Sequence, residues 1–160
     1  MKALVVVDMQ DFFDPCGKNY RKVKEKVVKK IDQFQRYGNK IIVVQFMKQH
    51  KICKEVTEAI KGDHLYVEKY NQGGGDTLYE SLKDSGFLNT IDSYHFCGVH
   101  TCWCVHDTAK GLMEIFREKN INSKVRVLAN ACACHHDSAD NPYQTLCLNS
   151  QYFCVPYIKP

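Results

Sequence analysis

No part of this sequence forms an apolar run close to the roughly 20 residues that a membrane-spanning helix needs. The start, Met1-Lys2-Ala3, leads directly into a strand pattern and lacks the longer apolar region and small-residue cleavage site of a signal peptide. Internal repeats, low-complexity tracts and linker-like segments are also missing. We therefore expect one domain over residues 1–160, no membrane partner and a cytoplasmic location.

The sequence also has no large excess of positive or negative charge. The chain has 22 Lys and Arg against 18 Asp and Glu, a formal net charge of +4, which by itself does not indicate a nucleic-acid partner. Much of the excess falls within residues 18–30, where lysines at helical spacing are typical of a solvated helix face. A hydrophobic fraction of 44% is ordinary for a globular protein.

Cysteine, in contrast, is abundant. Nine cysteines in a short secreted chain would indicate a disulfide framework. Here the number is odd, no export signal is visible, and several cysteines lie inside apolar strand or helix patterns. We therefore predict reduced thiols.

Short apolar runs alternate with longer amphipathic runs, which is typical of βαβ units and a mainly parallel sheet. The first run, residues 3–7, is continuous and rich in valine, as in a strand that is covered on both faces. The sequence thus predicts an α/β fold with three layers, α-β-α, around a Rossmann-like doubly wound sheet. Predicted strands cover residues 3–7, 40–46, 65–69, 93–97 and 124–128, predicted helices cover 19–37, 53–61, 76–84 and 101–119, and a last helix within 138–150 and an edge strand at 152–155 complete the pattern.

Three residues with reactive side chains lie at the ends of predicted strands. Asp8 follows the first strand, Lys69 ends the third, and Cys104 lies just inside the helix after the fourth. Right-handed crossovers place the carboxyl ends of parallel strands on one edge of the sheet, where ligands bind. Each residue alone has a simpler interpretation, as a turn aspartate, a surface lysine or a buried thiol. Their coincidence at this edge favours a catalytic site.

The chemistry of such a site begins with the thiol. Thr101 as N-cap would place Cys104 in the first helical turn, where the helix dipole and a nearby ammonium lower the pKa of a cysteine. Free backbone N–H groups at the helix start would also stabilise an oxyanion. Asp8 would accept the thiol proton and return it to a leaving amine.

Several segments resemble the isochorismatase-like cysteine hydrolase family, which includes nicotinamidases and related amidases. The family pattern has a strand ending in Asp-x-Gln, matched by Asp8-Met9-Gln10, and a lysine after the third strand, matched by Lys69. Its most specific part, Gly-Val-x-Thr-x-x-Cys-Val, is matched by residues 98–105, and Thr108-Ala109 continues the match. The resemblance spans about residues 3 to 135.

This resemblance implies that Cys104 is the nucleophile, Asp8 the base and Lys69 the group that orients and stabilises the thiolate. It implies a cis peptide between Val99 and His100, and an oxyanion hole formed by the backbone N–H groups of His100 and Cys104. The expected chemistry is attack on a carbonyl carbon, release of ammonia or an amine, and hydrolysis of a thioester. Many relatives form dimers or tetramers, so we expect a small-molecule substrate and a homo-oligomer.

The resemblance also suggests which residues surround the substrate. The family often has a serine and a phenylalanine where this chain has Gln72 and the glycines 73–75, so we expect altered specificity and a mobile loop. The short segment between Gln45 and Lys69 implies a small or open lid. The candidates for the pocket are Gln10, Phe13, Tyr70, Gln72, Trp103 and His135.

No cofactor and no metal are expected. Nicotinamidases carry an Asp-x-His and a further histidine after the second strand, whereas residues 47–51 hold one histidine, His50, and no aspartate. We expect His50 and His64 to be surface residues. The run from Cys132 to Asp137, with Cys134, His135 and His136, has the wrong spacing for a zinc knuckle. We interpret that run as structural, although His135 or His136 could contact the substrate or a neighbouring subunit.

The sequence leaves three interpretations. The leading one is a metal-independent hydrolase of a small amide or carbamoyl compound. The second is a catalytically drifted family member that acts as an interaction module. The third is a thiol redox sensor. Residues two apart on a helix point about 200° apart, so Cys102 does not replace Cys104 in the same site. We expect Cys102 to be a spare thiol. The alternative is a resolving partner for an oxidised Cys104, although the same geometry argues against a direct bridge between the two.

Overall fold

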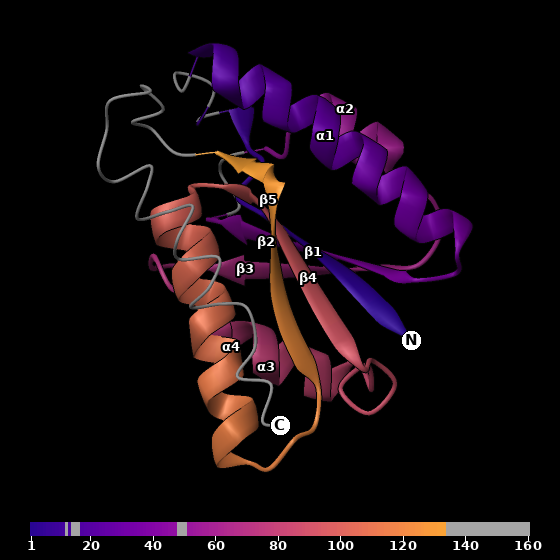
Figure 1. The fold of residues 1–160 in the computed structure, drawn as a ribbon, viewed down its shortest axis with the longest axis vertical. Helices are drawn as coiled ribbons and strands as arrows, with labels where there is room; N and C mark the ends of the chain where they lie inside the picture. Colours follow the sequence, from indigo (N-terminus) through magenta and orange to yellow (C-terminus); the bar gives the residue numbers. More distant parts are fainter. Residues whose placement is uncertain (12, 14–16, 48–50, 134–160) are drawn as a thin grey trace.

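Five parallel strands form one sheet in the order β3-β2-β1-β4-β5 (Figure 1). The structure is a computed structural model, and it describes residues 1–11, 13, 17–47 and 51–133. The strands are β1 (Lys2–Val7), β2 (Lys40–Phe46), β3 (His64–Lys69), β4 (Ser93–Val99) and β5 (Lys124–Ala133). The helices are α1 (Gly17–Arg36), α2 (Lys54–Ala59), α3 (Gly75–Asp84) and α4 (His106–Glu118), and a π-helical segment, η2, covers Thr101–Val105.

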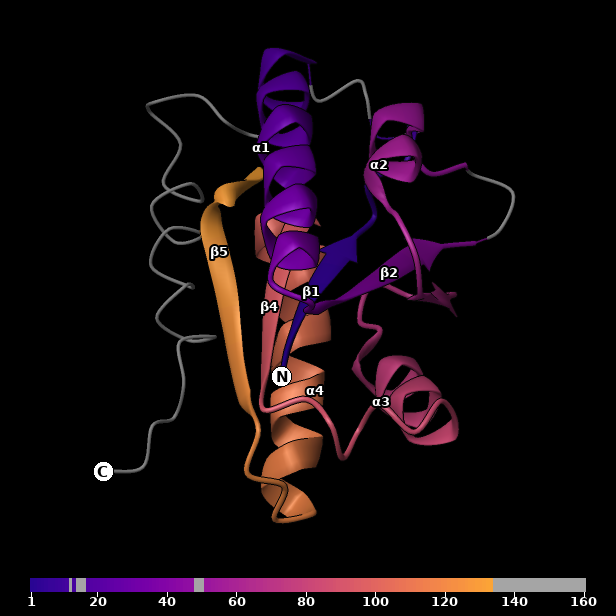
Figure 2. The ribbon, with the colours of Figure 1, turned by 90° about the vertical axis from the view of Figure 1, so that its right-hand side faces the viewer.

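Helices cover both faces of the sheet. Figures 1 and 2 show α1 and α2 on one face and α3 and α4 on the other. In β1, Val5 and Val7 pack into the core under α3 and α4, whereas Leu4 and Val6 pack into the core under α1 and α2. Because alternate side chains point to opposite faces, a strand buried on both sides is apolar at every position. The three-layer, parallel α/β fold is confirmed.

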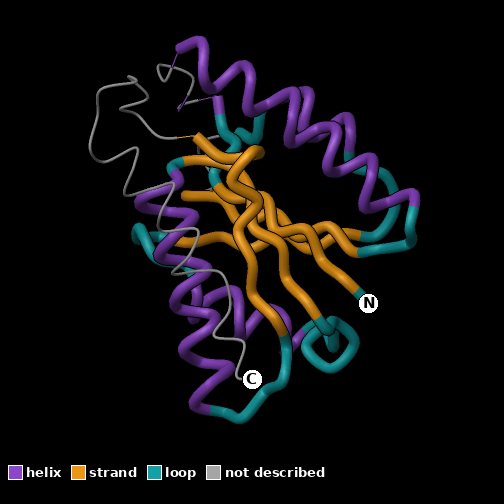
Figure 3. The backbone as a smooth tube through the Cα atoms, in the orientation of Figure 1, coloured by secondary structure: helices purple, strands orange, loops and turns teal. Residues whose placement is uncertain are grey.

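The predicted strands and helices are also found, with two extensions. The strand β4 continues to Val99 and β5 continues to Ala133, so both reach the upper edge of the sheet in Figure 3. A register shift after Phe96 lets the two strands pair again at Gly98 and Cys132. The helix predicted from Thr101 starts with the π-helical segment instead of a regular α-helical turn. The predicted helix within 138–150 and the edge strand at 152–155 lie outside the described residues.

The helix α1 shows why the lysine-rich stretch is a helix face. Val23, Val27 and Ile31 are buried at helical spacing, whereas the ammonium of Lys24 forms a 2.6 Å ion pair with Glu55 at the start of α2.

Among the described residues, no helix is both long enough and apolar enough to cross a membrane.

The winding of the sheet reverses between β1 and β4, and a glycine makes their close approach possible. Gly98 has a φ of +118°, and a Cβ at this position would lie 2.0 Å from the carbonyl oxygen of Val7. Only glycine fits both conditions. The carboxyl ends of β1 and β4 therefore meet side by side, directly before Asp8 and the segment that carries Cys104.

Two buried tyrosines provide a test of this packing. The Tyr94 hydroxyl is buried without a hydrogen-bond partner among the described residues, whereas the Tyr20 hydroxyl donates to the carbonyl oxygen of Gln10 at 2.9 Å. We expect Tyr94→Phe to leave the free energy of unfolding unchanged or higher, and Tyr20→Phe to lower it by about 1 kcal/mol. Urea unfolding monitored by circular dichroism measures both. A clear loss of stability in Tyr94→Phe would show that its hydroxyl is bonded in solution.

Candidate active site

Asp8 follows β1 at the centre of the sheet and is completely buried. Its backbone has a φ of +50°, its N–H donates to the carbonyl oxygen of Val44 at 2.9 Å, and its carbonyl oxygen accepts the N–H of Gln10 at 2.8 Å. These bonds turn the chain sharply at the strand end. The carboxylate is thereby held over the carboxyl edge of the sheet.

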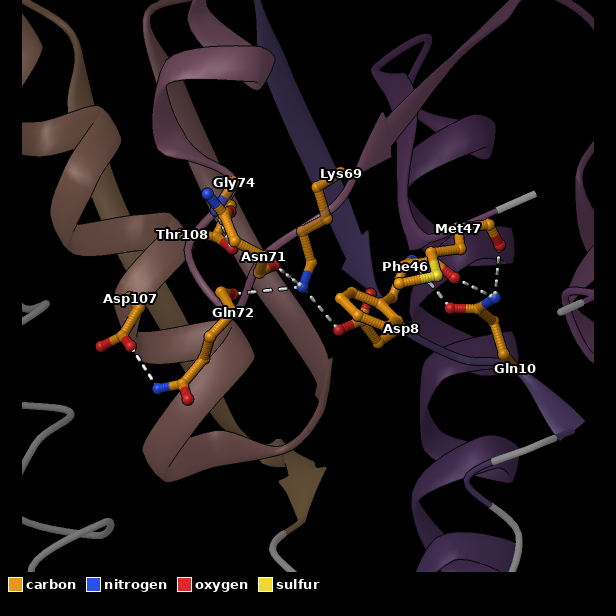
Figure 4. Close-up of polar contacts among 10 residues, drawn as sticks. All are labelled: Asp8, Gln10, Phe46, Met47, Lys69, Asn71, Gln72, Gly74, Asp107 and Thr108. Atoms are coloured by element: carbon orange, nitrogen blue, oxygen red, sulfur yellow. Dashed lines mark hydrogen bonds and ion pairs between the residues drawn. The ribbon is translucent and has the colours of Figure 1, made fainter. Parts of the chain in front are cut away.

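Gln10 fixes the same turn from the other side. Its amide oxygen accepts the backbone N–H of Phe46 at 2.8 Å, and its amide nitrogen donates to the carbonyl oxygen of Phe46 at 2.9 Å (Figure 4). The side chain thus ties the end of β1 to the end of β2. Gln10 was expected near the substrate, and the structure gives its amide this role between strands.

Lys69, the last residue of β3, reaches across the end of β2 to Asp8. Its ammonium lies 2.9 Å from the Asp8 carboxylate, and it donates to the carbonyl oxygens of Asn71 at 3.0 Å and Gln72 at 3.1 Å (Figure 4). The side chain is fully buried, with the ammonium 5.2 Å from the centre of the Phe46 ring. The three N–H groups of the ammonium match these three oxygens. The Lys69 ammonium is therefore held in one position.

Cys104 lies in the π-helical segment that links β4 to α4. The carbonyl oxygen of His100 accepts the N–H groups of Trp103 and Val105, both at 3.1 Å, and the peptide between Val99 and His100 is cis. The thiol is partly buried and interacts with the Asp8 carboxylate and with the backbone of His100. The thiol, the carboxylate and the ammonium therefore lie together at one edge of the sheet.

The pKa of the thiol differs from the sequence-based expectation. Burial, followed by the negative charge of Asp8, raises the pKa of Cys104 to about 12, although Lys69 and the backbone of His100 act in the opposite direction. Burial also raises the pKa of Asp8, against the lowering effect of Lys69. The expected lowering of the thiol pKa is thus wrong for the free site, because desolvation outweighs the cation. The resting thiol is neutral, beside the Asp8–Lys69 ion pair.

Aromatic rings lie next to this centre. His100 is almost fully buried, and its ring packs edge-on against Phe13, with centroids 5.4 Å apart, and against Trp103, with centroids 5.8 Å apart. Trp103 is 42% exposed and Tyr70 is 71% exposed. Of the six pocket candidates, Phe13 and Trp103 therefore gather around His100, and Tyr70 lies largely in solvent.

The remaining candidates are placed as follows. The Gln72 amide donates to the carboxylate of Asp107, and His135 lies outside the described residues, as do His50 and the run from Cys134 to Asp137. His64 is exposed, with its Nδ1 2.7 Å from the carbonyl oxygen of Gly62. Within the described ranges, no three side chains of histidine, cysteine, aspartate or glutamate gather where they could hold a metal ion. The described free thiols are Cys53, Cys97, Cys104 and Cys132.

The loop between Lys69 and α3 makes close contacts at its glycines, and the mobility expected from these glycines stays a prediction. The N–H of Gly74 donates to the Thr108 hydroxyl at 3.1 Å, and a Cβ at Gly74 would lie 2.7 Å from the Lys69 side chain. A Cβ at Gly75 would lie 2.6 Å from the backbone of Leu112 in α4. Gly74 thus allows close packing against Lys69, and Gly75 allows close packing against α4. The contact of the loop with Asp107 and Thr108 was missed, because these residues are more than 30 positions from it in sequence.

Comparison with known proteins agrees with this architecture. Residues 2–141 match the family model of the isochorismatase domain. Among solved structures, the MAR1 ribonuclease from Caenorhabditis elegans superposes with a TM-score of 0.78 at 15% sequence identity, over 96% of this chain and 73% of that chain. No curated protein matches the sequence.

Two amidases are similar as well. The N-carbamoylsarcosine amidase from Thermoplasma acidophilum has a TM-score of 0.69 at 20% identity, covering 97% of this chain and 95% of its own. The nicotinamidase from Staphylococcus aureus has a TM-score of 0.65 at 23% identity, covering 92% of this chain and 91% of its own. At such identities the likeness shows a shared fold.

The raised pKa of the thiol leads to a test on the free protein. Because a pKa of about 12 leaves little thiolate at neutral pH, alkylation of Cys104 by iodoacetamide should accelerate about tenfold per pH unit, without a plateau, between about pH 7 and pH 10. Mass spectrometry of the peptide that contains Cys104 separates it from the other thiols. A plateau near neutral pH would show a thiolate in the resting site.

Proposed function

We propose, because this chain belongs to the isochorismatase family, that it hydrolyses the C–N bond of a small amide or carbamoyl substrate through a thioester on Cys104. The family is one of hydrolases, and its fold neighbours include two amidases. The observation that carries the proposal is the buried 2.9 Å ion pair between Asp8 and Lys69 beside the Cys104 thiol. It supplies a base, a compensating charge and a nucleophile in one place.

The first half of the reaction forms the thioester. As the Cys104 sulfur attacks the carbonyl carbon, its proton passes to the Asp8 carboxylate, and the negative charge appears on the carbonyl oxygen of the substrate. The nitrogen of the leaving group then takes the proton from Asp8, and the C–N bond breaks. Apart from the ion pair, neither Asp8 oxygen has a hydrogen bond of regular geometry among the described residues, so the carboxylate can accept this proton.

The second half releases the acid. A water molecule gives one proton to Asp8, and the oxygen of this water attacks the thioester carbon. The C–S bond then breaks, and the proton held by Asp8 returns to the sulfur of Cys104. The backbone N–H groups of His100 and Cys104 stabilise the oxyanion in both halves. Lys69 offsets the charge of Asp8 throughout, held in place by its three oxygen partners.

This arrangement suits a carbonyl substrate better than RNA, the substrate class suggested by the name of the ribonuclease neighbour. Phosphoryl transfer relies on cations that stabilise the negative charge of the phosphate oxygens. The ammonium nearest the thiol, that of Lys69, is fully buried and bonded to protein oxygens. A neutral amide carries no negative charge and therefore does not need to contact the Lys69 ammonium. We propose a single domain that forms a homo-oligomer, as many relatives do.

Mutation of the three central residues tests the activity. Ammonia release from a panel of small primary amides and ureido compounds should be abolished in Cys104→Ala. It should fall at least about a hundredfold in Asp8→Asn and in Lys69→Met, because each change removes a group that acts in the transition state. Ser81→Ala, at a partly exposed position of α3 away from the three central residues, serves as the control with unchanged activity.

The other interpretations give different results in the same experiment. RNA cleavage that is lost in Cys104→Ala, without ammonia release, would replace the amidase by a ribonuclease. A reversible loss of the Cys104 thiol in peroxide, with a second cysteine trapped in a disulfide, would support a redox sensor. Inertness in every assay would support an interaction module.

Metal dependence can be tested separately. Because the segment after β2 lacks the Asp-x-His pattern, turnover should be unchanged after dialysis against EDTA and should not rise when zinc or manganese is added. Ammonia release before and after dialysis measures this. A loss of activity on dialysis that a metal restores would contradict the prediction.

A further inference from the structure

The loop that holds Lys69 is fastened to α4, the helix that directly follows the π-helical segment with Cys104. The residues Asn71–Gly74, here called the lysine loop, direct two carbonyl oxygens at the Lys69 ammonium, at 3.0 Å from Asn71 and 3.1 Å from Gln72. On its other side, the loop contacts Asp107 and Thr108 in the first turn of α4 (Figure 4). The loop therefore connects the Lys69 ammonium to the first turn of α4, directly after the segment that holds Cys104.

Two hydrogen bonds fasten the loop. The buried Thr108 hydroxyl accepts the N–H of Gly74 at 3.1 Å, and the Asp107 carboxylate accepts the side-chain amide of Gln72. Asp107 is itself oriented by His106, whose Nδ1 lies 2.8 Å from its other oxygen. The first bond is in the interior and the second is at the surface. Together they hold the loop at Gln72, which supplies one of the two carbonyl oxygens, and at Gly74, where the loop ends.

The position of the ammonium matters because its charge is not screened by water. Lys69 is fully buried and acts on both Asp8 and Cys104, favouring the charged form of each. Without the two carbonyl oxygens, Lys69 would keep only one of its three partners. A long, unbranched side chain with one contact left has many alternative rotamers.

We propose that Asp107 and Thr108 are positioning residues that, through the lysine loop, hold the Lys69 ammonium against Asp8. This inference rests on the proposed function for its role in turnover, although the placement of the charge is a property of the free protein. The two residues touch neither the thiol nor the carboxylate. They set the electrostatics of the site from the first turn of α4.

The first test uses surface variants that leave the core intact. Gln72→Leu and Asp107→Ala should each slow the alkylation of Cys104 by iodoacetamide at pH 9 by about threefold to tenfold, because a displaced cation raises the thiol pKa and each pKa unit is tenfold in thiolate. The double variant should be no slower than either single variant, since both remove the same bond. Lys69→Met gives the upper limit of the effect, and Ser81→Ala is the unchanged control.

Whether alkylation of Cys104 becomes slower or faster in Asp107→Ala distinguishes two effects: displacement of the Lys69 ammonium and loss of the charge of Asp107. Removal of the negative Asp107 carboxylate would by itself favour the thiolate and speed alkylation. Slower alkylation in Asp107→Ala, equal to that in the uncharged change Gln72→Leu, therefore supports the lysine loop. Unchanged or faster alkylation in both variants, or additive effects in the double variant, would overturn the proposal.

A second test addresses the buried bond and turnover. Thr108→Val should slow alkylation at pH 9 and Thr108→Ser should restore the wild-type rate, whereas a merely structural role would change stability and leave this rate unmoved. In turnover, the acid limb of the pH profile of kcat/KM should shift to higher pH in Gln72→Leu, because Asp8 is harder to ionise once the cation moves. If the wild type turns over no amide, the proposed function fails, and the alkylation rates still decide the role of the loop.

Discussion

The buried ion pair between Asp8 and Lys69 is the constraint on which the site depends. Both side chains are fully excluded from solvent, and removing two charges from water costs several kcal/mol for each ion. A contact of 2.9 Å and two backbone carbonyl oxygens offset this cost. Because either charge alone would be strongly unfavourable, the surrounding backbone must hold both at once. The turn after β1, the glycines of the lysine loop and the start of α4 all serve this requirement.

The parallel sheet explains why the pair forms where it does. Asp8 follows the central strand β1, whereas Lys69 ends β3, two strands away and about 10 Å distant at the usual strand spacing. The lysine spans the gap along the end of β2, and its ammonium lies 5.2 Å from the centre of the Phe46 ring. The thiol approaches from the other side, because β4 is the next neighbour of β1 and Gly98 lets the two strand ends come close. The strand order thus places Lys69 on one side of Asp8 and Cys104 on the other.

The strands and the placement of the three central residues were predictable from the sequence. The pKa of the thiol and the contacts of the lysine loop were not, because they depend on tertiary packing. Buried strands such as residues 40–46 are continuous apolar runs, and parallel connections bring their carboxyl ends together, so the juxtaposition of Asp8, Lys69 and Cys104 followed from local patterns. The direction of the thiol pKa did not follow, because it depends on how completely the packing removes water around Cys104. The contact between Gln72 and Asp107 joins side chains 35 residues apart, and no periodicity indicates it. The close approach of Gly74 to the Lys69 side chain likewise depends on tertiary packing that a run of glycines does not indicate.

A neutral resting thiol also bears on which chemistry the site favours. Oxidants and disulfides react with thiolates, so a redox sensor needs a cysteine that is ionised and accessible before its partner arrives. With a pKa of about 12, Cys104 is neither activated nor fully exposed in the free protein. A hydrolase has no such need, because the proton can pass to Asp8 while the charge moves through sulfur to the oxygen of a bound carbonyl. The burial that suppresses the free thiolate therefore disfavours a sensor and is compatible with acyl transfer.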